Sequence, residues 1–249
     1  MHPSSAPDWC GLIVVDKPLA LSSMDVVHRV RLAATRGRSI VAGVRLKKTK
    51  CGHAGTLDPL ATGVVVCGIG RATRSLADLM DLTKVYDATV DLSAFTTTDD
   101  REGPRTEVSV ACPPDAEALR GACAAMVGDA VEQIPPAFSA IHVNGRRAYD
   151  LARRGEDVKM RPRWVRIDAI ELLDYAWPHA QLRVTCGKGT YIRCIARDLG
   201  VALGTGGHLA ALRRTAVGGY HAEDAWPIER FDTPLQADDL LALPPTAAL

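Results

Sequence analysis

The stretch Cys51-Gly-His-Ala-Gly-Thr-Leu-Asp-Pro-Leu-Ala-Thr-Gly63 is the most informative part of this 249-residue chain. Its Asp58 is the only carboxylate between Val26 and Ala77, in 52 residues that contain ten Lys and Arg. Such a positive field keeps a carboxylate ionised even where partial burial would raise its pKa. The glycines allow close backbone approach, and Pro59 stiffens the chain after Asp58. Asp before Pro also opens ordinary turns, so these residues alone leave both a structural and a catalytic role open.

Short strands and helices alternate irregularly around this stretch. Residues 11–16 and 64–67 have the apolar character of buried strands, and a helix capped by Ser22 or Ser23 is predicted between them. The alternation over residues 84–92 predicts a strand with Tyr86 facing inward. Several neighbours are expected to be antiparallel, so the sequence predicts an α+β (mixed α/β) fold with a mixed, largely antiparallel central sheet flanked by helices and loops.

Composition excludes several classes of protein. With 47% hydrophobic and 24% charged residues, the chain is typical of a soluble globular protein. No apolar run approaches a membrane span and the start does not resemble a secretory signal, so we expect no membrane partner and a cytoplasmic location. The seven cysteines form no Cys-x-x-Cys pair, which argues against a metal site. We expect a monomer.

The net charge of +1 averages over segments of opposite sign. Arg29–Lys50 has eight basic residues and no acidic one, and Arg146–Arg166 has eight basic against three acidic. Residues 222–249 have six acidic and one basic. One basic run alone would suit a solvated surface, but two runs that flank other informative residues favour contacts with a nucleic-acid backbone.

Two glycine motifs resemble nucleotide-binding loops without completing them. Gly68-Ile-Gly70-Arg-Ala-Thr73 follows a strand, as in dinucleotide-binding units, but has Thr at the third small position. Gly187-Lys-Gly-Thr190 lacks the Ser or Thr that must follow the phosphate-loop lysine. An NTPase is rejected, and a nicotinamide-dependent oxidoreductase stays a distant alternative that would require a bound dinucleotide.

Blocks of sequence in a fixed order resemble the TruB family of tRNA pseudouridine synthases. They are Gly11–Pro18, Gly52–Gly63, Lys84-Val-Tyr86, Phe138-Ser-Ala140 with Gly145–Tyr149, Lys188–Arg193 and Leu212-Arg-Arg214. The resemblance implies the pseudouridine synthase fold and isomerisation of uridine 55 in the TΨC loop of tRNA, with the base flipped out and no cofactor. The T-arm stem-loop of tRNA is the expected partner.

The resemblance also assigns roles to individual residues. Asp58 would be the essential catalytic carboxylate, Tyr86 would stack against the target base and Arg193 would pair with Asp58. Tyr191 and Leu212 would line the pocket, and His53 would help to hold the extruded loop. The candidates for contacts with the RNA backbone are Arg45, Lys47, Lys48, Lys50, Arg146, Arg147, Arg153 and Arg154.

One carboxylate is enough for this chemistry. Glycoside hydrolysis normally needs two, because water must be activated. Uracil leaves with its charge delocalised over its own carbonyls and returns to the same sugar. Whether the carboxylate attacks the sugar, attacks the base or removes a sugar proton stays open at this point.

The domain plan follows from these blocks. Residues 1–10 are expected to be a disordered lead and residues 11–221 the catalytic domain, with a long basic loop at 36–57 and a basic strand-turn-helix region at 138–166. Residues 222–249 are expected to be a short acidic tail, with a short helix followed by a loose end, in place of the family's C-terminal PUA-type domain. The basic loop would then partly replace that domain by binding phosphates. The competing hypothesis is a non-catalytic tRNA-binding or folding factor with the same fold.

Overall fold

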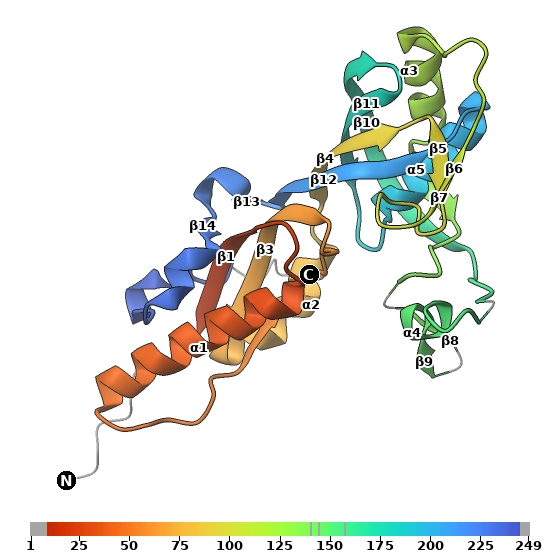
Figure 1. The fold of residues 1–249 in the computed structure, drawn as a ribbon. Coiled ribbons are helices and arrows are strands. Elements are labelled where there is room, and N and C mark those ends of the chain that lie inside the picture. The colour runs from red at the N-terminus through yellow and green to blue at the C-terminus, as the bar shows by residue number, and fades with distance from the viewer. Residues whose placement is uncertain (1–8, 140, 144, 157, 245–249) are drawn as a thin grey trace. The chain divides into compact units, whose positions relative to one another are not determined.

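The chain forms two compact units in the computed structural model, which describes residues 9–139, 141–143, 145–156 and 158–244 (Figure 1). The first unit contains the described residues up to Leu82 and those from Arg214 onward, and the second runs from Thr83 to Arg213. The region predicted as one domain over residues 11–221 therefore contributes to both units. Residues 1–8 of the predicted lead lie outside the described residues. Trp9, predicted as part of that disordered lead, is instead buried because its ring packs where Gly37 leaves space.

The first unit is built on a mixed sheet with the strand order β14-β1-β3-β12. Strand β1 pairs antiparallel with β3 and parallel with β14, and buried aliphatic residues of β1 and β3 form the core. Helix α1 packs against β1, β2 and β3. The strands are β1 (Gly11–Lys17), β2 (Cys51–His53), β3 (Ala61–Ile69), β13 (Tyr220–His221), β14 (Trp226–Pro227) and the end of β12 (His208–Val217); the helices are α1 (Ser23–Ala42), α2 (Leu76–Asp81), and the short 3-10 helices η1 (Gly70–Ser75), η2 (Ala222–Asp224), η3 (Ile228–Asp232) and η4 (Ala237–Asp239).

Helix α1 is longer than the sequence predicts. It begins at a capping box between Ser22 and Asp25, as expected, and ends at Gly43, which has a left-handed φ of 68°. The predicted loop over residues 36–57 is therefore wrong for 36–42, which are helical, and for 51–53, which form β2. The apolar pattern of the helix is interrupted at Gly37. This glycine is buried so closely that an added Cβ would overlap the Leu235 carbonyl. Close backbone packing replaces apolar side chains there, so the hydrophobic period disappears while the helix continues.

The predicted acidic tail is a packed part of the first unit over its described residues. Strand β14 pairs with β1, and Ile228, Phe231 and Leu235 are buried. Farther on, Leu241 exchanges two backbone hydrogen bonds with Leu12, at 2.8 and 2.9 Å. The prediction of a loose tail is wrong here because the segment is anchored by backbone pairing and by irregularly spaced apolar residues. Neither gives a helical or strand period in the sequence.

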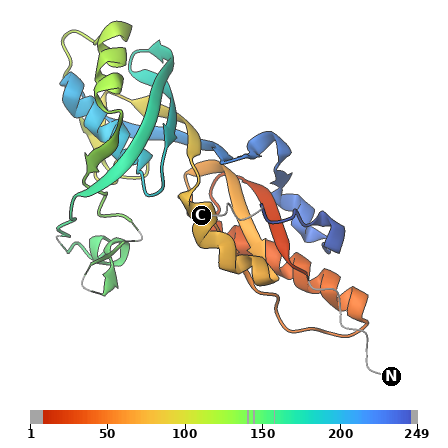
Figure 2. The same ribbon diagram turned by 180° about the vertical axis from the view of Figure 1, so that it is seen from behind.

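The second unit has a sheet with the strand order β12-β4-β11-β10-β7, in which the pairs from β4 to β7 are antiparallel. Helices α3 and α5 contact each other and the sheet (Figure 2). The elements are β4 (Lys84–Asp91), β5 (Ala94–Thr96), β6 (Arg105–Glu107), α3 (Ala116–Ala125), β7 (Gly128–Gln133), β8 (His142–Val143), β9 (Arg146–Arg147), α4 (Ala148–Ala152), β10 (Arg163–Ala176), β11 (His179–Cys186), α5 (Ile192–Leu203) and the start of β12. The predicted fold class, α+β with a mixed and largely antiparallel sheet, is confirmed.

The region predicted as basic strand, turn and helix corresponds to β8, β9 and α4. Strands β8 and β9 pair antiparallel, and α4 follows directly. Asn144 of the predicted turn lies outside the described residues.

Candidate active site

The loop between β2 and β3 contains Asp58, whose side chain is half-buried. Ser23, in the first turn of α1, fixes Leu57, the residue before Asp58. The Leu57 N–H donates to Ser23 Oγ at 2.7 Å, and the Ser23 hydroxyl donates to the Leu57 carbonyl at 3.1 Å. On the other side, the Ala20 N–H donates to the Pro59 carbonyl at 2.9 Å. Backbone bonds on both sides of Asp58 therefore set the position of its carboxylate.

Arg214 supports the same loop from within the core. Its side chain is 1% exposed, its Nε donates to the Val64 carbonyl at 2.7 Å, and a terminal nitrogen donates to the Gly55 carbonyl at 3.1 Å. Gly63 has a φ of 104°, and a Cβ there would overlap the Arg214 backbone. Only glycine satisfies both the left-handed backbone and this close approach. The arginine thus ties the two ends of the Asp58 loop together.

Lys17 is a buried cation that interacts with Asp58. It is fully buried at the end of β1, and its ammonium group donates to the Leu21 carbonyl at 2.7 Å and the Pro18 carbonyl at 3.1 Å. Burial lowers the pKa of Lys17 to about 8, while the Asp58 carboxylate opposes that change. The opposite charges of Lys17 and Asp58 therefore attract each other, which agrees with the positive field expected from the sequence.

His53 is half-buried at the end of β2. Burial lowers its pKa, and repulsion from Arg214 adds to the effect. Its Nδ1 is buried and has no hydrogen-bond partner among the described residues. The neutral ring is therefore favoured near pH 7 and offers hydrogen bonds without a charge.

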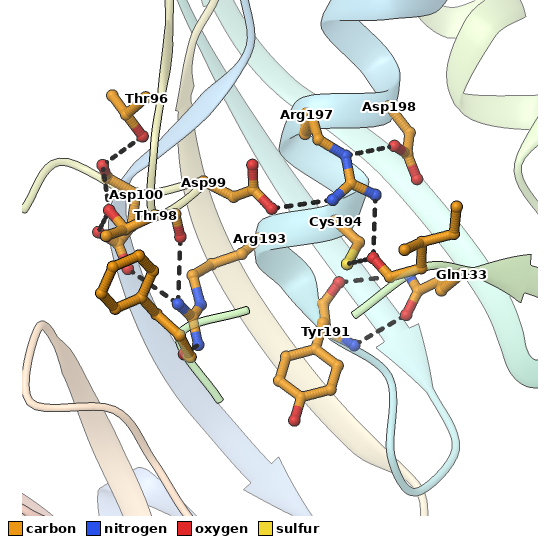
Figure 3. Close-up of polar contacts among 12 residues, drawn as sticks. Thr96, Thr98, Asp99, Asp100, Gln133, Tyr191, Arg193, Cys194, Arg197 and Asp198 are labelled. Carbon is orange, nitrogen blue, oxygen red and sulfur yellow. Dashed lines mark hydrogen bonds and ion pairs between the residues drawn. The ribbon is translucent and has the colours of Figure 1, made fainter. Parts of the chain in front are cut away.

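In the second unit, Tyr86 and Arg193 are both buried. Tyr86 lies on β4 opposite Val184 of β11 and is 8% exposed, so its predicted inward orientation is confirmed. Arg193, in the first turn of α5, donates to the Asp100 carboxylate at 3.3 Å and to the carbonyls of Thr98 and Phe138, each at 3.1 Å (Figure 3). A buried guanidinium needs such partners, because an uncompensated charge is costly away from water.

Tyr191 is held through its backbone. Its N–H donates to Gln133 Oε1 at 3.0 Å, and its carbonyl accepts from Gln133 Nε2 at 3.2 Å (Figure 3). The Arg163 guanidinium lies 4.4 Å from the centroid of the tyrosine ring, within cation–π range. Leu212 is half-buried on β12.

The predicted site residues thus fall into two groups. Asp58 and His53 belong to the first unit, and Tyr86, Tyr191, Arg193 and Leu212 to the second. The sequence did not single out the residues that support them, which are Lys17, Ser23, Asp100, Gln133 and Arg214. Lys17 and Arg214 at least fall inside the blocks that carry the family resemblance, whereas Ser23 and Gln133 have no comparable signal.

The basic candidates for RNA contacts lie at the surface. Seven are exposed: Arg45, Lys47, Lys48, Lys50, Arg146, Arg153 and Arg154. Arg146 pairs with Glu156 at 3.1 Å, and the Arg153 guanidinium lies 5.6 Å from the centroid of the Tyr149 ring. The side chain of Arg147 lies outside the described residues.

Comparison with known families decides the relationship. Residues 44–192 match the family described as TruB family pseudouridylate synthase (N terminal domain), and residues 193–240 match the tRNA pseudouridylate synthase B C-terminal domain. The chain belongs to the TruB family. The second TruB match includes residues 222–240, so the packed acidic segment falls in a region that the family's own C-terminal description covers.

Individual relatives agree with this assignment. The chain is 46% identical over 240 residues to tRNA pseudouridine synthase B of Paracoccus denitrificans, covering 96% of this chain and 75% of the relative. It is 47% identical over 223 residues to the protein of that name from Corynebacterium efficiens, covering 88% and 70%. A crystal structure of a Cbf5-Nop10-Gar1 complex has the same fold, with a TM-score of 0.65 and 24% identity. That match covers 92% of this chain and 55% of the solved chain.

Two further features bear on the chemistry. Among the residues that the structure describes, no three His, Cys, Asp or Glu side chains gather closely enough to hold a metal ion. No described helix combines the length and apolar character needed to cross a membrane.

Proposed function

We propose that this TruB-family chain converts uridine 55 of the tRNA TΨC loop to pseudouridine, with Asp58 as the essential carboxylate. The observation that carries the proposal is the support around Asp58. Ser23 and Ala20 bond the backbone on either side of it, and its charge attracts that of the buried Lys17. The curated relatives named tRNA pseudouridine synthase B supply the substrate class.

The reaction breaks the bond between uracil N1 and the ribose and forms a bond from C5 to the same ribose carbon. The base leaves and returns within one site, so no water has to be activated. The proton on C5 is released to water at the end. A single ionised carboxylate therefore suffices, and a rigid loop that presents it lowers the cost of ordering the reacting groups.

The remaining roles follow from the family resemblance. Tyr86 stacks on the target base and so replaces stacking that the base loses when it leaves the loop. Arg193 pairs with Asp58, and Tyr191 and Leu212 line the pocket. His53 holds the extruded loop by hydrogen bonds, for which its neutral ring is suited.

The exposed basic residues after α1 and around α4 contact phosphates of the T-arm. Each such contact releases counterions, so the affinity for RNA should fall steeply with salt. Arg45, Lys47 and Lys48 are the clearest candidates, because they are exposed in a stretch without acidic residues.

The test is release of tritium from a T-arm stem-loop whose uridine carries tritium at C5. The parent should release it and Asp58→Asn should not. Asp78→Asn, at an exposed carboxylate of α2, is the matched control and should keep the parent's rate. Release by Asp58→Asn would refute the role of Asp58, and release by none of the three would favour the non-catalytic tRNA-binding factor.

A further inference from the structure

A cavity of about 270 Å³ lies in the first unit, between the start of η1 and the segment that follows α1. That segment returns along the helix (Figure 2). The Leu46 N–H donates to Ser39 Oγ at 3.1 Å, and the Thr49 N–H donates to Thr35 Oγ1 at 3.0 Å. Its lining includes Trp9, Arg38, Thr49, Lys50, Arg71 and Arg74. Its size is below the usual range for drug-sized ligands and suits a small group.

The lining is strongly positive. Four of the eight lining residues are Arg or Lys and none is acidic. The acidic segment over residues 222–244 contacts a different part of α1. The Asp232 carboxylate pairs with Arg29 at 3.4 Å, and the Asp232 backbone carbonyl accepts a hydrogen bond from Arg36. Four like charges around a small cavity repel one another, and an anion bound among them would relieve that repulsion.

Two buried donors in the lining lack acceptors. Trp9 is 3% exposed, and its indole Nε1–H has no hydrogen-bond partner among the described residues. The same holds for Nε of Arg38, whose terminal nitrogen donates to Thr49 Oγ1 at 3.1 Å. A buried donor without an acceptor costs free energy comparable to a lost hydrogen bond. Two donors of the lining thus lack an acceptor, and the lining residues carry no negative charge.

We propose that this cavity binds a phosphate group of the substrate RNA backbone. A phosphodiester supplies both missing elements, a negative charge and acceptor oxygens, in a group small enough for the space. The site is distinct from the Asp58 loop and adds Arg38, Arg74 and the indole N–H of Trp9 to the RNA contacts expected from the sequence. RNA as the source of the phosphate rests on the proposed function, whereas the anion site itself rests on the cavity.

The position of the cavity suits an RNA that also reaches Asp58. Lys50 lines the cavity, and β2 leads directly from it to His53. At about 3.3 Å per strand residue the cavity lies roughly 10 Å before His53. A few nucleotides of an RNA strand suffice to span that distance.

The experiment measures affinity for an end-labelled T-arm stem-loop against KCl concentration, by fluorescence anisotropy. The test variant is Lys50→Gln with Arg74→Gln, both at exposed positions, and a second variant is Arg38→Gln. Arg101→Gln with Arg120→Gln removes the same charge from exposed positions of the second unit and is the control. Circular dichroism melts establish that each variant is folded. Inorganic phosphate is titrated separately by calorimetry.

We expect the test variant to bind RNA roughly tenfold more weakly, since the lost hydrogen bonds are charged. The slope of log Kd against log salt should fall by about 0.7–0.9, the value for one lost phosphate contact. Inorganic phosphate should bind the parent and the control but not the test variant. An unchanged RNA slope, or equal phosphate binding by parent and test variant, would overturn the proposal. If inorganic phosphate alone were affected, the anion site would stand and RNA would be refuted as its source. The RNA and phosphate binding measurements do not depend on catalysis. A parent protein that released no tritium would refute the proposed function without changing them, so failure of the function and failure of the anion site are distinguishable.

Discussion

Replacing Ser23 by Ala tests whether α1 positions the catalytic loop. Ser23 Oγ accepts from the Leu57 N–H at 2.7 Å and donates to the Leu57 carbonyl at 3.1 Å, and both residues are buried. The substitution adds no bulk but deprives two buried backbone groups of their partner, at about 1–3 kcal/mol each. We expect the free energy of unfolding to fall by about 2–6 kcal/mol. Because Leu57 adjoins Asp58, we also expect kcat to fall by roughly 100-fold, the order of loss for a small misplacement of a reacting group.

Its neighbour Ser22 provides the matched control. Ser22 caps α1 but makes its side-chain bonds to Asp25 rather than to the Asp58 loop. Ser22→Ala should therefore cost about 1 kcal/mol, as other helix caps do, and leave kcat unchanged. Urea denaturation followed by circular dichroism gives the stabilities, and tritium release at saturating RNA gives kcat. If Ser23→Ala kept the parent's kcat, or lost no more stability than Ser22→Ala, the positioning argument would be wrong.

Three other outcomes follow from the same loop. Gly63→Ala should fail to fold or lose at least about 3 kcal/mol of unfolding free energy. Gly43→Ala, with a similar left-handed φ but open space around it, should lose about 1–3 kcal/mol. Equal losses in thermal melts would contradict the overlap with Arg214. Arg214→Met should lower the unfolding free energy by about 3 kcal/mol in urea, because two charged hydrogen bonds to carbonyls disappear, and a loss below about 1 kcal/mol would argue against that support. The pKa of Lys17 is lowered from 10.5 to about 8, so between these pH values the unfolded chain binds more protons than the folded one. The unfolding free energy of the parent should therefore rise with pH relative to that of Lys17→Met. Urea midpoints of the two proteins that stay parallel from pH 8 to 10.5 would refute this.

Patterns that depend on neighbouring residues were predictable from the sequence. Alternation placed Tyr86 on the inward face of β4, and Ser22 or Ser23 was predicted to start α1, where Ser22 is the cap. The fold class followed from the irregular order of strands and helices. The motif around Asp58 was visible because a lone carboxylate in a basic stretch is a local feature.

Contacts between distant segments were not predictable in this way. Ser23 bonds a residue 34 positions away, and Arg214 bonds carbonyls 150 and 159 positions away. No period or motif encodes such pairs. The end of α1 was predicted wrongly because Gly37 adds no apolar side chain to the helical pattern. Its close packing against the backbone of Leu235 has no signature in the sequence.

The central claim is that Asp58 converts one particular uridine. Its most direct test is to digest T-arm stem-loops to nucleosides after incubation and to quantify pseudouridine by chromatography. We predict one pseudouridine per RNA with uridine at position 55, none when cytidine replaces it, and none with Asp58→Asn on either RNA. Pseudouridine in the cytidine RNA, or its formation by Asp58→Asn, would contradict the account.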